Sequence, residues 1–92
     1  MKPDTYHKQQ AKKLGVVVKP STNPKKKLDV FKDNKKMASI GAEGYRDYNS
    51  YKKKEGLAVA DVKRKSYIAR HKCAGAKKDT PNYYSCNILW GK

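Results

Sequence analysis

The pattern of apolar and polar residues changes along this chain, and it is weakest in residues 1–26. In residues 1–26, Lys, Gln, Pro, Ser, Thr and Asn surround one short apolar run, 14–18. Such a segment buries too little apolar surface to offset the entropy lost on ordering. We therefore expect residues 1–26 to form an extended basic arm, disordered on its own. Its β-branched run 16–18 could pair with a sheet edge.

A β-hairpin is predicted directly after the arm. Two apolar runs flank the polar segment 32–35, in which Asp33 and Asn34 suit a tight turn. This pattern predicts that strand Lys27–Phe31 pairs with strand Lys36–Ile40.

Helices are predicted in the second half of the chain. Asn49 or Ser50 can cap a short helical turn that Gly56 interrupts. Residues 57–72 are helix formers throughout, and we expect an amphipathic helix packed on the hairpin. Its expected apolar stripe contains Val59, Val62, Ser66 and Ala69, widened by Ala58, Tyr67 and Ile68.

A last, shorter helix is expected to begin at Pro81. Thr80 is a suitable N-cap, and proline is favoured at the first helical position. The expected buried side contains Tyr83, Cys86, Ile88, Leu89 and Trp90. The sequence thus predicts an α+β fold: a small single domain, 27–92, with an N-terminal hairpin packed on one long and one short helix, preceded by the arm. No apolar run approaches the ~20 residues that span a bilayer, and we expect a soluble chain without a signal peptide.

The charge is strongly positive, with 23 Lys and Arg against 8 Asp and Glu and a formal net charge of +15. Residues 1–28 carry a surplus of seven positive charges, residues 29–56 a surplus of two, and residues 57–92 a surplus of six. Such a density of like charge attracts polyanions, acidic protein surfaces or anionic lipid headgroups, and does not distinguish among them.

Two groups of residues are candidates for contact with such a partner. The arm offers Lys2, Lys8, Lys12, Lys13, Val16, Val17, Val18, Lys19, Lys25 and Lys26. The long helix offers a basic face with Lys63, Arg64, Lys65, Arg70 and Lys72. This face could lie along a nucleic-acid backbone, with nearby tyrosines stacking on bases, or it could be solvated or meet acidic residues of a neighbouring subunit.

Cysteine and histidine raise the question of a metal site. His71, Cys73 and Cys86 are suitable zinc ligands by type, but structural zinc sites usually have four ligands and a C-x₂₋₄-C knuckle. We expect no metal and no cofactor. Cys73 and Cys86 could instead form a disulfide between the two helices, or remain two half-buried thiols.

No catalytic constellation is visible. The acidic residues are scattered among cations, no glycine-rich phosphate loop follows a strand, and no serine lies in a nucleophile elbow. We expect a protein that is not an enzyme and that has no small-molecule substrate.

Several segments resemble, in order and spacing, a family of small basic proteins of large DNA viruses. These segments are Lys27–Phe31, Ala38–Tyr45, Asp47-Tyr48, Tyr67–His71, Pro81–Tyr84 and Leu89-Trp90. The family is found notably in viruses of algae, of the chlorovirus or phycodnavirus type, with relatives in marine phages. The phage relatives have similar segments to Arg70–Cys73 and Tyr83–Cys86, whereas other algal-virus relatives lack the cysteines, so the thiols are not expected to carry the common function.

The resemblance implies a viral structural protein of unknown activity. Our leading hypothesis is a minor capsid component of the virion, made in the host cytoplasm, whose basic arm and small domain cement neighbouring capsid subunits. The alternative is a sequence-independent DNA-binding protein that neutralises or condenses the packaged genome. A third hypothesis is contact with the anionic face of an inner membrane.

Overall fold

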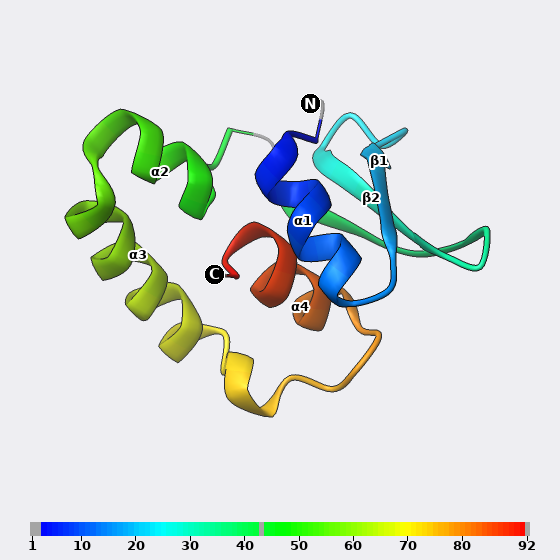
Figure 1. Cartoon of the computed structure of the whole chain (residues 1–92). Helices are drawn as coiled ribbons and strands as arrows, with labels where there is room; N and C mark the ends of the chain where they lie inside the picture. The colour runs from blue at the N-terminus through cyan, green and yellow to red at the C-terminus, as the bar shows by residue number, and fades with distance from the viewer. Residues whose placement is uncertain (1–2, 43, 92) are drawn as a thin grey trace.

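A three-stranded antiparallel sheet lies on one side of the molecule and a helical hairpin on the other, with the N-terminal and C-terminal helices between them (Figure 1). The structure, a computed structural model, describes residues 3–42 and 44–91. The strands are β1 (Val17–Pro20), β2 (Lys26–Lys32) and β3 (Lys35–Ala42). The helices are α1 (Thr5–Lys13), α2 (Tyr48–Glu55), α3 (Leu57–Arg70), α4 (Pro81–Tyr84), the short 3₁₀ helix η1 (Cys73–Gly75) and the π-helical turn η2 (Ser85–Leu89).

The predicted β-hairpin is confirmed, with each strand slightly longer than expected. Strands β2 and β3 pair with Leu28 opposite Ile40. Asp33 and Asn34 have φ angles of 52° and 65°, which are the left-handed values that a tight two-residue hairpin turn requires. Asp and Asn tolerate this conformation better than most residues, so the local sequence selects the turn.

The predicted extended arm is wrong for the part of residues 1–26 that the structure describes. Helix α1 begins after Asp4, whose carboxylate accepts a hydrogen bond from the His7 backbone N–H at 3.1 Å, while the His7 ring accepts one from the Asp4 N–H. Strand β1 then adds to the edge of β2, with Val18 opposite Val30. Met1 and Lys2 lie outside the described residues.

Tertiary packing explains why this segment folds. Its few apolar residues cannot form a core alone, but Ala11, Val16 and Val18 are all buried against the rest of the protein. The sequence pattern therefore underestimated residues 1–26, because the apolar surface that they need is supplied from residues far along the chain.

Helix α3 has nearly the predicted bounds, but its predicted apolar stripe is partly wrong. The Val62 side chain is 65% exposed, whereas Ala60 is fully buried. The helix packs mainly against α2 and, through Tyr67, against Trp90, rather than directly on the hairpin. The short helix α4 is the one that packs on β3, and it begins with the predicted Thr80 cap and Pro81.

The C-terminal segment closes the core. The side chains of Tyr84, Cys86, Ile88, Leu89 and Trp90 are buried there, while Tyr83 packs against the core from its edge. The predicted buried side of the last helix is thus largely confirmed, and Trp90 is a core residue as expected.

Candidate functional site

An open groove of about 840 Å³ lies between the end of β3 and helix α3, with the C-terminal segment as its floor. Five cationic residues line it: Lys26, Lys27, Arg46, Lys63 and Arg70. Five aromatic residues line it as well: Tyr45, Tyr51, Tyr67, His71 and Trp90. The buried acidic residue Asp47 is also part of the lining. We call this feature the basic–aromatic groove.

Helical periodicity places the groove residues of α3 on one face. Lys63, Ser66, Tyr67 and Arg70 are separated by three, four and seven residues, which is the spacing of neighbours along one side of a helix. The two cations therefore flank the Tyr67 ring along the groove wall.

The opposite wall is formed by the sheet and by the loop after β3. The Lys27 ammonium group donates a hydrogen bond to the backbone carbonyl of Tyr45, which ties the loop to β2. At Gly41, where φ is 79°, a Cβ atom would lie 3.1 Å from Leu89 Cδ1, so glycine allows the strand to approach the groove floor closely.

Two further contacts order the end of the groove near α2. The Arg46 guanidinium group pairs with the Glu55 carboxylate at 2.6 Å and lies 5.7 Å from the centre of the Tyr51 ring. The Lys63 ammonium group lies 5.7 Å from the same ring. Tyr51 thus holds two cations at the groove through attraction to its ring face.

The rings form a stack that runs from the core to the surface. Tyr67 lies between Trp90, at a centroid distance of 4.6 Å and an angle of 11°, and His71, at 4.1 Å and 25°. On the other rim, the Tyr45 side chain is 73% exposed. The groove therefore combines positive charge with aromatic surface.

Several acidic side chains accept hydrogen bonds from other groups of the protein. Asp29 accepts hydrogen bonds from the hydroxyls of Ser21 and Ser39 at 2.7 and 2.6 Å. Burial would raise the pKa of Asp29, but these bonds and those from Thr22 and Lys36 outweigh it and hold the pKa well below its usual range.

Other carboxylates are used in the same way. Asp4 accepts from the Asn49 side chain, Asp61 from the Tyr48 hydroxyl at 2.8 Å, and Asp79 from the Tyr84 hydroxyl at 2.5 Å. Since the chain has 23 cationic side chains and only 8 acidic ones, internal pairing leaves a large positive excess for an external partner.

The predicted arm residues do not form one site. Lys8, Lys12 and Lys13 lie on α1, Lys19 on β1, Lys25 in the following loop, and Lys26 on β2 at the groove. Val16 and Val18 are buried in the core, whereas Val17 on the same strand is 56% exposed. Lys2 lies outside the described residues.

The predicted basic face of the long helix is divided. Lys63 and Arg70 line the groove, whereas the Arg64 guanidinium group turns inward and donates a hydrogen bond to the Trp90 carbonyl at 2.7 Å. Lys65 is exposed, and Lys72 lies beyond the helix end in a left-handed conformation.

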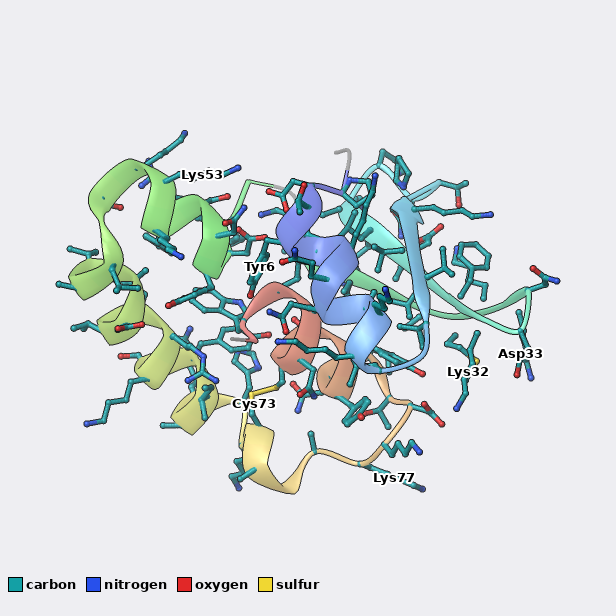
Figure 2. The ribbon with its side chains drawn as sticks, in the orientation of Figure 1. Tyr6, Lys32, Asp33, Lys53, Cys73 and Lys77 are labelled. Atoms are coloured by element: carbon teal, nitrogen blue, oxygen red, sulfur yellow. A yellow bond between two sulfur atoms is a disulfide. The ribbon has the colours of Figure 1, made fainter. Side chains whose placement is uncertain are left out.

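Cys73 and Cys86 form a disulfide, which ties the segment after α3 to the C-terminal helix (Figure 2). Within residues 3–42 and 44–91, no group of three or more His, Cys, Asp or Glu side chains could hold a metal ion. No helix in this part of the chain is long and apolar enough to cross a membrane.

Sequence reasoning missed several groove residues. Tyr45, Arg46 and Tyr51 lie in or after the loop that follows the hairpin, and nothing in their spacing predicts that this loop faces α3. His71 was considered as a candidate zinc ligand and as part of the segments that carry the family resemblance, but not as a groove residue. The clustering of Tyr and basic residues around 45–54 was the available signal, but the tertiary fold decides which of them share a surface.

The fold and the groove define a small, strongly basic α+β domain with an open surface of cations and rings. The chain belongs to DUF5754, a family of unknown function, whose family model matches residues 16–71. The match begins at the start of β1 and ends at His71, so it includes both walls of the groove. No significant match was found among curated proteins or among solved structures.

Proposed function

We propose that this protein is a non-enzymatic, sequence-independent nucleic-acid-binding protein, and that the basic–aromatic groove is its binding surface. The observation that carries the proposal is the convergence of five cationic residues and five rings from four separate segments of the chain on one groove. Cations contact phosphates irrespective of sequence, and rings stack on any base.

The contacts inside the groove support this function over simple surface charge. Tyr51 orders Arg46 and Lys63, and the Lys27 bond orders the loop that carries Tyr45. Ordered side chains lose less entropy when they bind a ligand, so their contacts contribute more affinity than those of freely mobile lysines.

The remaining lysines are distributed around the protein. Lys32, Lys53 and Lys77, for example, lie on different sides of the molecule (Figure 2). These charges would attract a polyanion from a distance and raise its association rate, without defining where it binds.

A role as a minor capsid component stays a prediction that rests on the family resemblance, as does a location in the virion. The extended arm can no longer be part of this hypothesis. Residues 5–13 and 17–20 belong to the folded domain and cannot thread between subunits. A protein that neutralises packaged nucleic acid would be compatible with the same particle.

The test is the salt dependence of nucleic-acid binding, measured by fluorescence anisotropy with generic oligonucleotides. We expect the logarithm of the affinity to fall linearly with the logarithm of salt concentration, with a slope of about 0.9 per phosphate contacted in duplex DNA and about 0.7 in a single strand. The decisive variant is Lys63→Gln/Arg70→Gln, in the groove.

The matched control is Lys8→Gln/Lys12→Gln, which removes the same charge from exposed positions on α1. The groove variant should weaken binding and flatten the slope more than the control. Equal effects of the two variants, or an affinity for oligonucleotides that does not depend on salt, would overturn the proposal.

A further inference from the structure

The stack of rings in the groove ends at the surface in His71. Trp90 is buried, Tyr67 is half-buried, and His71 is exposed. The Tyr67 ring already has a neighbour on each face, so the stack can grow only beyond the imidazole.

Hydrogen bonds hold this stack in place. The His71 backbone N–H donates to the Tyr67 carbonyl at 2.9 Å, and the Asn82 side chain donates to the His71 carbonyl at 2.9 Å. The Tyr67 hydroxyl pairs with the Ser85 hydroxyl at 2.7 Å. The imidazole is therefore presented by a stack anchored in both α3 and α4.

The surroundings of His71 suit a nucleotide. Arg70 precedes it in the groove wall and can contact a phosphate, while Pro81 and Asn82 line the groove from α4. A planar base that stacks on the imidazole would continue the series Trp90–Tyr67–His71, with the strand's backbone toward the cations.

We propose that the groove binds single-stranded nucleic acid, with one base stacked on His71. Within a duplex, each base is already stacked and paired, and taking it out has an energetic cost that an unpaired strand does not incur. The proposal rests on the proposed function and adds the kind of strand and the residue that receives the base.

The probe that separates stacking from charge is a short oligothymidine compared with an abasic strand of the same length. Both carry the same phosphates, so a purely electrostatic site binds them equally. A stacked base should make the oligothymidine bind roughly 5- to 150-fold more tightly, the range expected for one base on one aromatic ring.

Variants of His71 complete the experiment. His71→Ala should reduce the preference for oligothymidine over the abasic strand, with the salt slope unchanged, whereas His71→Tyr keeps a ring and should retain the preference. Circular dichroism of each variant checks that it folds.

The outcomes distinguish the two proposals. Equal binding of the thymidine and abasic strands by the wild type overturns the stacking proposal but leaves nucleic-acid binding intact. If neither strand binds, both fail. Equally tight binding of a polyglutamate of matched charge would also overturn the stacking proposal, because it would indicate an acidic protein partner instead.

Discussion

His7 and Asp47 form a buried hydrogen-bonded pair that fastens the N-terminal helix to the rest of the protein, with 2.5 Å between His7 Nε2 and Asp47 Oδ2. His7 Nδ1 accepts a hydrogen bond from the backbone N–H of Asp4, so Nε2 carries the proton that is donated to Asp47. Asp47 also accepts from the Ser50 backbone N–H at 2.9 Å, which caps α2. One carboxylate thus joins α1 to α2.

Replacing His7 should be strongly destabilising. His7→Ala leaves the Asp47 carboxylate buried without its main partner, and we expect the free energy of unfolding to fall by about 3–5 kcal/mol. Urea denaturation measures the loss. Lys8→Ala, on the exposed side of the same helix, is the control and should change stability by less than about 0.5 kcal/mol. Similar values for the two variants would show that α1 is not fastened through this pair.

Asp29 should make stability depend on pH in the acid range. Because its folded-state pKa is lowered, the stabilisation is present above the unfolded-state pKa of about 3.9 and is lost as the pH falls. At neutral pH, Asp29→Asn should lower the free energy of unfolding by about 1–3 kcal/mol, and the difference from the wild type should narrow below about pH 4.

Denaturation curves at a series of pH values measure this effect. Asp33→Asn removes the same charge from the exposed hairpin turn and separates a general charge effect from the buried hydrogen bonds. If the free energies of unfolding of Asp29→Asn and the wild type differ by the same amount at every pH down to the lowest at which both fold, the assigned role of Asp29 is contradicted.

The disulfide should stabilise the C-terminal half of the fold. Cys73 and Cys86 are 13 residues apart, and closing a loop of that size contributes about 3 kcal/mol in the chain-entropy description. We expect a reductant to lower the melting temperature of the wild type, and Cys73→Ser/Cys86→Ser to be less stable but insensitive to reductant. Two free thiols in the natively folded protein, purified without reductant, would show that the bond does not form.

The parts of the fold that could be predicted are those that depend on residues close together in the sequence. Asp33 and Asn34 select the hairpin turn, and Thr80 with Pro81 begins the last helix, because each acts within its own few residues. The disulfide could be raised as one of two alternatives, but not chosen, since the distance between two helices is a tertiary property.

For residues 1–26, the local sequence was not enough to predict the fold. Apart from the Asp4–His7 cap, nothing in the local sequence shows which residues bury His7, Ala11 and Val18, so the segment looks unable to fold. Its partners are Asp47, the C-terminal segment and β2, and only the tertiary structure brings them together. The groove was missed for the same reason, because its walls come from β2, the loop after β3 and α3.

The most direct test of the central claim is amide chemical-shift mapping by NMR while the wild-type protein is titrated with a short oligothymidine. If the basic–aromatic groove is the binding site, the largest shifts should occur at Tyr45, Ser66, His71 and Asn82 and at the indole N–H of Trp90. Shifts confined to α1 and the tip of the β2–β3 hairpin, with the groove signals unchanged, would contradict the account.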